Sequence, residues 1–209
     1  MEHVFDADEV RGVLHTPEHA TGDGLALTHG AGSNANAALL VSLSRAFCGA
    51  GLVVLRYDLP FRVARPGGPP GPEGTPAAAR DREGVARAVE ALRRRVRGRV
   101  FAGGHSYGGR QTAMIAAERP GLADGLLLLS YPLHPPKKPD QPRTAFFPEW
   151  RTPALFVHGT RDPFGTLEEL RGAMRLIPAR VDLLAVEGAG HDLRPAARMG
   201  GEILARMLF

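Results

Sequence analysis

The chain has few of the residues that mark secreted, metal-binding or membrane proteins. Cys48 is the only cysteine in 209 residues, so no intrachain disulfide can form, and we expect it to be a small core residue. No apolar run reaches the length of about 18 residues that a membrane span needs. The N-terminus has acidic residues at positions 2, 6, 8 and 9 and lacks the basic start of a signal peptide. No H-E-x-x-H motif is present. These absences predict a cytoplasmic protein with no metal, no cofactor and no membrane partner.

Lysine is also scarce, because Lys137 and Lys138 are the only two and arginine carries the remaining positive charge. The formal net charge is +4 and the sequence pI is about 9.8. The densest basic cluster, at positions 93–99, ends a predicted helix, where basic side chains complement the helix dipole. Because no basic stripe alternates with aromatic residues, we interpret the charge as a solvated surface and expect no nucleic-acid partner.

Short apolar runs separated by helix-length amphipathic stretches predict the fold class. The runs do not alternate in polarity, which is typical of parallel strands buried on both faces. Strands are predicted at 25–28, 52–55, 100–103, 126–129, 154–157 and 181–186. Helices are predicted at 35–50, 75–97, 107–118, 167–177 and 195–208, and edge strands near residues 3–5 and 13–15. The pattern predicts one α/β domain over residues 1–209, with a mainly parallel sheet and helices on both faces.

Two proline-rich segments interrupt this alternation. Residues 66–74 are Pro- and Gly-rich and predict a loop. Residues 131–152 contain many prolines and no helical period, so they predict an excursion over the carboxyl edge of the sheet. This second segment is too short to fold around a core of its own, which excludes a cap domain.

Residues 104–109 read Gly-His-Ser-Tyr-Gly-Gly and follow an apolar strand. This is the G-x-S-x-G pattern of a nucleophile elbow, with Ser106 at its centre. A sharp strand-to-helix turn of this kind exposes the serine hydroxyl to a base, and its glycines allow strand and helix to approach closely. The alternative is an ordinary glycine-rich turn with an incidental serine.

An acid and a histidine follow in the order that such a serine requires. Asp162 comes just after the strand at 154–157, and His191 just after the strand at 181–186. Alone, Asp162 could be a turn residue and His191 a surface loop residue. Because the carboxyl ends of parallel strands meet at one sheet edge, we expect Ser106, Asp162 and His191 to form a catalytic triad.

The loop after the strand at 25–28 completes the predicted site. The backbone N–H groups of Tyr107 and Ala31 are the expected oxyanion hole. Residues 30–35 also fit the dinucleotide pattern G-x-G-x-x-A, with Asp58 as the ribose-binding acid. That alternative leaves the three triad residues unexplained.

These motifs resemble those of α/β hydrolases related to dienelactone hydrolase, and most closely the small hydrolase-like proteins grouped with the Tex and KANL domains. The stretches that carry the resemblance are 27–32, 55–58, 104–110, 130–134 and 155–162. The resemblance implies a hydrolase fold with Ser106, Asp162 and His191 in the triad positions. Dienelactone hydrolases carry cysteine at the elbow, where this chain has serine, so their substrate does not carry over.

Together the motifs predict a serine hydrolase that cleaves a small ester or related acyl substrate through an acyl-enzyme. The alternative from another class is a non-catalytic binding or scaffold protein on a hydrolase fold. The proline-rich cover predicts an open site that prefers short acyl groups. Substrate contacts are expected from His29, Arg62, Arg110 and His134. The basic groups expected at the rim of the opening, which are Arg62, Arg110, His134, Lys137 and Lys138, predict a preference for a substrate that carries a carboxylate or phosphate.

Overall fold

The sheet has eight strands in the order β1-β2-β4-β3-β5-β6-β7-β8. The computed structural model describes residues 1–208. The strands are β1 (Glu2–Ala7), β2 (Val10–His15), β3 (Gly24–Thr28), β4 (Val53–Tyr57), β5 (Val100–His105), β6 (Gly125–Leu129), β7 (Ala154–Gly159) and β8 (Val181–Val186). The pairs β1·β2 and β2·β4 are antiparallel, and all other pairs are parallel. The predicted mainly parallel sheet with N-terminal edge strands is therefore confirmed.

The central strands are buried on both faces, and their side chains divide between two cores. In β3, Leu25 and Leu27 pack into one apolar cluster while Ala26 packs into the other. This division follows from the two-residue period of a strand, which sends successive side chains to opposite faces. Every residue of β3, β4 and β6 is buried.

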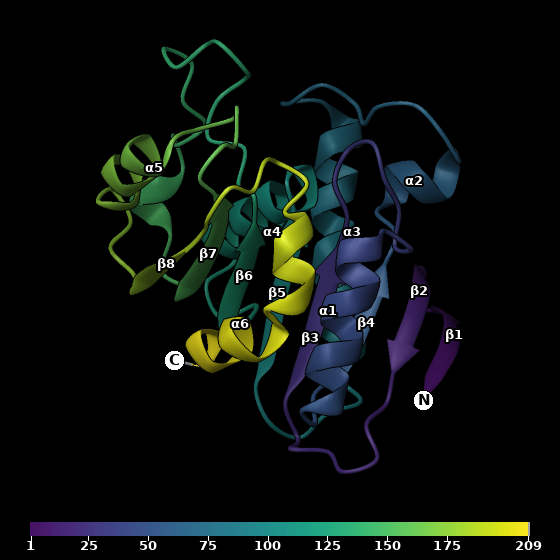
Figure 1. Cartoon of the computed structure of the whole chain (residues 1–209). Helices are drawn as coiled ribbons and strands as arrows, with labels where there is room; N and C mark the ends of the chain where they lie inside the picture. The colour runs from purple at the N-terminus through teal and green to yellow at the C-terminus, as the bar shows by residue number, and fades with distance from the viewer. Residues whose placement is uncertain (209) are drawn as a thin grey trace.

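Helices cover both faces of the sheet (Figure 1). One core includes apolar residues of α1 (Ala38–Gly49) and α6 (Gly200–Met207). The other includes apolar residues of α3 (Pro76–Arg93), α4 (Tyr107–Glu118) and α5 (Leu167–Met174). This arrangement confirms the predicted layers, because each helix buries its apolar face against the sheet.

The segment between β6 and β7 forms no separate domain. It contains only the short 3-10 helix Phe147–Glu149, and its aromatic residues pack back onto the main body. Tyr131, Phe147 and Trp150 are fully buried, and the Tyr131 and Phe147 ring centroids are 5.6 Å apart. The prediction of an excursion without a cap domain is confirmed.

Several details differ from the sequence expectations, including helix bounds: α3 ends at Arg93 and α5 at Met174, before the predicted ends at 97 and 177. A short helix α2 (Pro60–Ala64) follows β4, where proline at the first helical position sets the backbone angle. The C-terminal helix is divided into a 3-10 turn (Arg194–Arg198) and α6, which begins at Gly200. Gly200 packs against α1, since a Cβ there would lie 2.5 Å from the Ala46 Cβ. Cys48 is half-buried rather than a core residue, because it lies at the edge of the packed face of α1.

Candidate active site

Ser106 lies in the turn between β5 and α4 in a strained backbone conformation. Its φ is 50° and its ψ is -116°, a region that residues with side chains rarely adopt. The turn is held by a hydrogen bond from the Ser106 N–H to the Leu129 carbonyl at 2.8 Å. A Cβ on Gly104 would lie 2.7 Å from the Gly108 carbonyl carbon, and one on Gly108 would lie 2.4 Å from the His29 carbonyl oxygen. A side chain at either position would therefore force the strand, the helix and the neighbouring loop apart.

The side chains of Ser106, His191 and Asp162 form one continuous chain of hydrogen bonds. His191 Nε2 lies 2.8 Å from Ser106 Oγ. His191 Nδ1 lies 2.8 Å and 3.0 Å from the two carboxylate oxygens of Asp162. Since the carboxylate accepts the Nδ1 proton, Nε2 is left to accept the Ser106 hydroxyl proton. The structure thus brings these residues together from the loops after β5, β7 and β8.

The surroundings of Asp162 favour its charged form. Its side chain is buried, which by itself would raise the pKa, but the hydrogen bond and charge of His191 outweigh this effect. The Phe164 N–H also donates to Asp162 Oδ1 at 2.9 Å. The resulting pKa of Asp162 is below its ordinary value, so the carboxylate stays ionised at neutral pH. The Phe164 ring stacks on the His191 imidazole with centroids 4.1 Å apart.

Two further histidines fix the loops that carry Asp162 and His191. His105 Nε2–H donates to the His191 carbonyl at 2.7 Å, and His158 Nε2–H donates to the Gly165 carbonyl at 2.8 Å. Desolvation lowers the pKa of both histidines, which keeps them neutral at physiological pH. They therefore position the loops without adding positive charge beside His191.

His29 organises the loop that holds Ala31. It is fully buried, its Nδ1–H donates to the Gly30 carbonyl at 2.9 Å, and its Nε2 accepts the Leu59 N–H at 3.1 Å. Burial lowers the pKa of His29, so it remains neutral. Because the peptide is trans, the Ala31 N–H points away from the Gly30 carbonyl that His29 holds.

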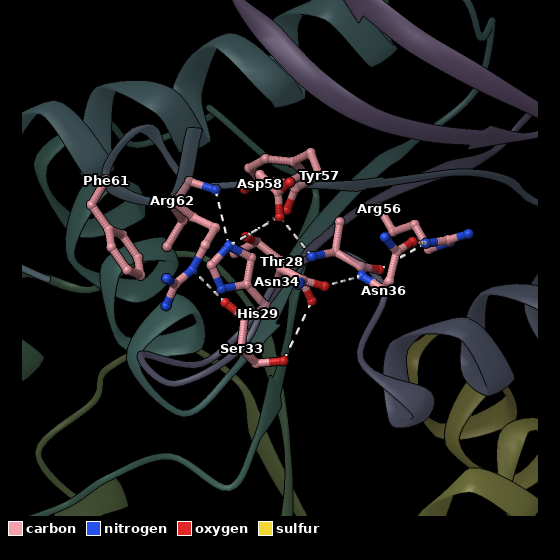
Figure 2. A network of polar contacts seen from close by, with 12 residues as sticks. Thr28, His29, Ser33, Asn34, Asn36, Arg56, Tyr57, Asp58, Phe61 and Arg62 are labelled. Atoms are coloured by element: carbon pink, nitrogen blue, oxygen red, sulfur yellow. Dashed lines mark hydrogen bonds and ion pairs between the residues drawn. The ribbon is translucent and has the colours of Figure 1, made fainter. Parts of the chain in front are cut away.

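Arg62 supports the same loop from the other end. Its guanidinium donates to the Ser33 carbonyl at 2.7 Å and to the Ala31 carbonyl at 2.8 Å. It also donates to carbonyls of the loop that follows α2, at Arg65, Pro66 and Gly68. Figure 2 shows the Arg62 and His29 side chains packed beside Ser33. Both side chains are therefore occupied in holding backbone.

Polar residues of β4 and the turn after it fix the far end of this loop. Asp58 accepts the Ala35 N–H at 2.7 Å, and the buried Arg56 donates to the Ala35 carbonyl at 2.8 Å and to Asn36 Oδ1 at 2.6 Å (Figure 2). The dinucleotide alternative would use Asp58 to bind a ribose. In the structure this carboxylate instead binds the loop itself.

Asp81 supports Tyr107, the residue after the elbow serine. It is buried on α3, accepts the Tyr107 hydroxyl at 2.7 Å and accepts the Phe61 N–H at 2.9 Å. Burial raises the pKa of Asp81, against the effect of these two donors. Tyr107 is the first residue of α4, so its own N–H has no acceptor within the helix.

A cavity of about 310 Å³ opens beside Ser106. Its walls include Ala31, Tyr107, Arg110, Arg143 and Phe164. A second hollow of about 320 Å³ shares Arg110 and Arg143 with it and extends to Phe146. A third hollow, of about 400 Å³, lies between the loop after β3, which includes Gly30, and α1. Ser106 does not line it.

The structure brings some of the sequence-predicted site residues together and separates others. Ser106, Tyr107, Ala31 and Arg110 line one cavity, and His191 and Asp162 lie beside it. His134 lies elsewhere, lining a hollow against α5 and donating to the Pro135 carbonyl at 2.8 Å. Sequence reasoning missed four residues around the site, and none of them lies in a motif: Glu73, Asp81, Arg143 and Phe164.

A comparison with protein families identifies the fold. The family described as "Alpha/beta hydrolase domain" matches residues 22–207. The chain belongs to this α/β-hydrolase family. The resemblance noted from the sequence motifs is thereby confirmed at the level of this family.

Solved structures share the fold of this α/β hydrolase across nearly its whole length. A dienelactone hydrolase from Anabaena variabilis ATCC 29413 is 20% identical, with a TM-score of 0.74 over 99% of this chain and 98% of that one. Est1E from Butyrivibrio proteoclasticus is 16% identical, with a TM-score of 0.76 over 99% and 97%. An alpha-beta serine hydrolase homologue from Coxiella burnetii is 16% identical, with a TM-score of 0.73 over 99% and 96%.

The described part of this α/β hydrolase, residues 1–208, contains neither a candidate metal-binding cluster nor a helix suited to crossing a membrane. Within that range, no group of three or more His, Cys, Asp or Glu side chains is arranged to hold a metal ion. None of the helices there combines the length and apolar character that crossing a bilayer requires.

Proposed function

We propose that this α/β hydrolase is a serine hydrolase that cleaves a small ester or related acyl compound. The observation that carries the proposal is the unbroken hydrogen-bond chain from Ser106 through His191 to Asp162. A serine hydroxyl is a weak nucleophile unless a base accepts its proton, and His191 Nε2 is at the distance that this transfer needs.

The reaction proceeds in two halves. Ser106 Oγ attacks the substrate carbonyl as His191 accepts its proton, and His191 then returns that proton to the leaving alcohol, which gives an acyl-enzyme. In the second half, His191 accepts a proton from water as the water attacks the acyl-enzyme carbonyl. His191 then returns this proton to Ser106 Oγ, and the acid is released. Asp162 holds the imidazole tautomer and stabilises the imidazolium that forms in each half.

The oxyanion is stabilised by the N–H groups of Ala31 and Tyr107. The support for Ala31 is the way His29 and Arg62 hold the carbonyls on either side of it. The support for Tyr107 is its place at the N-terminus of α4, where a helix also stabilises negative charge. The cavity of about 310 Å³ favours small acyl groups over long ones.

The alternative, a non-catalytic binding protein on the same fold, predicts no activated serine. A fluorophosphonate probe tests this directly, because it labels only serines that a neighbouring base activates. We expect labelling of the wild-type chain and turnover of 4-nitrophenyl acetate. Ser106→Ala should abolish both, whereas Ser42→Ala, on α1, should retain both. A folded wild-type chain that is not labelled would support the binding-protein alternative, and labelling that survives Ser106→Ala would contradict the choice of nucleophile.

A further inference from the structure

Two arginines face the cavity beside Ser106. Arg110 lies on α4, and its N–H donates to the Ser106 carbonyl at 3.0 Å, so the two residues are one helical turn apart. Arg143 comes from the segment between β6 and β7, where its N–H donates to the Leu133 carbonyl at 2.7 Å and its carbonyl accepts the Tyr131 hydroxyl at 2.7 Å. Both backbones are therefore held in place.

The positive charge in this cavity is only partly compensated. Glu73 is the one carboxylate among the described residues that line this cavity and the hollow that shares Arg110 and Arg143 with it, against two guanidinium groups. The Arg110 side chain is only 7% exposed, and its buried Nε has no hydrogen-bond partner. Burial, followed by the nearby charge of Arg110, lowers the pKa of Arg143. A second anion would satisfy the free donor and relieve the repulsion between the arginines.

Glu73 already occupies the position that such an anion would take. Its carboxylate accepts a hydrogen bond from Arg110 Nη2. The Glu73 side chain is 54% exposed and belongs to the Gly- and Pro-rich loop before α3. Because the Glu73 carboxylate already lies largely in water, releasing it costs little, and another carboxylate that pairs with Arg110 can displace it.

We propose that the substrate is an ester that carries a carboxylate a short distance from its scissile carbonyl, and that Arg110 and Arg143 bind this carboxylate in place of Glu73. This inference rests on the proposed serine hydrolase function of the same site. The apolar part of the substrate, between its carboxylate and its scissile ester, would lie against Phe164, Pro70 and Pro132 in the cavity wall.

The test compares esters that differ only in this charge. The first pair is the mono-4-nitrophenyl ester of adipic acid and 4-nitrophenyl hexanoate, which places the carboxylate on the acyl side. The second pair is 4-acetoxybenzoate and its methyl ester, which places it on the alcohol side. The measured quantity is the ratio of kcat/KM for the anionic ester to that for the neutral ester, after subtraction of the rate with Ser106→Ala.

We expect at least one pair to show a ratio of about ten or more, since hydrogen bonds to charged groups are among the stronger ones. Arg110→Met and Arg143→Met should each lower this ratio about ten-fold, and Glu73→Gln should raise it. Arg171→Met, on the exposed surface of α5, removes the same charge and should leave the ratio unchanged, which excludes general electrostatic steering. Ratios near one in both pairs, or ratios that Arg110→Met and Arg143→Met do not alter, would overturn the proposal.

A binding measurement separates this inference from the proposed function. Calorimetry with Ser106→Ala and monomethyl adipate, against methyl hexanoate, measures recognition of the carboxylate without turnover. If Ser106→Ala binds monomethyl adipate and the added substitution Arg143→Met weakens this binding, the arginine site is supported even if no ester is cleaved. Turnover of neutral esters that depends on Ser106, combined with no preferential binding of monomethyl adipate, would refute the carboxylate site and leave the hydrolase proposal intact.

Discussion

Gly108→Ala tests how closely α4 must approach the loop after β3 that carries Ala31. A Cβ on Gly108 would lie 2.4 Å from the His29 carbonyl oxygen and 2.7 Å from Thr28 Cγ2. Ordinary contact begins at 3.4 Å, so helix and loop must separate by about 1 Å. The closest atom is backbone, which has no rotamer to change. The added methyl group therefore moves α4 away from the loop that carries Ala31.

The expected loss of activity follows from the geometry of the proposed oxyanion hole. Separating the Tyr107 N–H from the Ala31 N–H weakens one of two donors, and loss of one such donor costs about 10²–10³ in kcat. A displacement of about 1 Å at a catalytic group gives a similar figure, about 10². Overpacking should lower the free energy of unfolding by about 1–3 kcal/mol, offset in part by about 1 kcal/mol from the better helix propensity of alanine. We therefore expect a folded protein with kcat/KM reduced about 10²-fold or more.

The assay is kcat/KM for 4-nitrophenyl acetate, with circular dichroism and Tm as folding controls. Gly172→Ala is the matched control, because it lies within α5 and a Cβ there meets no atom within 4 Å. This control should keep its activity, and its Tm should be equal or higher. Full activity in folded Gly108→Ala would refute the argument that this contact sets the oxyanion geometry.

Three further predictions concern the acid, a buried histidine and a loop contact. Asp162→Asn should lower kcat about 10⁴-fold with Tm little changed, because the amide favours the wrong His191 tautomer; near-normal turnover would mean that another acid serves. His15 should make the protein acid-sensitive, since burial lowers its pKa to about 4 from an unfolded value near 6.5. The stability associated with neutral His15 is fully present above about pH 6.5. As the pH falls towards 4, the free energy of unfolding should decrease by about 3 kcal/mol. In urea unfolding, His15→Phe should therefore show a smaller decrease of this free energy with falling pH. His105→Phe removes the 2.7 Å hydrogen bond to the His191 carbonyl and should lower the free energy of unfolding by about 1 kcal/mol or more; an unchanged Tm would contradict that role.

The sequence by itself determined the fold class and the order of the candidate catalytic residues. Apolar runs in β3 to β7 are local signals, and a strand buried on both faces leaves the same signal wherever it lies in a sheet. The run at 181–186 predicted such a strand as well, but β8 lies at the sheet edge and is only partly buried. The elbow is equally local, since its glycines and Ser106 are contiguous. The expectation that Asp162 and His191 lie at the same sheet edge needed only the rule that parallel strands end together.

Only the tertiary structure decided what surrounds the serine. His29 and Arg62 were expected to contact substrate, yet their polar atoms bind backbone of loops that are distant in sequence. Glu73 and Arg143 meet Arg110 because the loop before α3 and the segment after β6 fold over the same end of α4. Such contacts depend on loop paths, and loops have no periodic pattern from which a side-chain direction can be predicted. For this protein, periodicity and motif order gave the framework, and long-range contacts decided which polar groups remain free for a substrate.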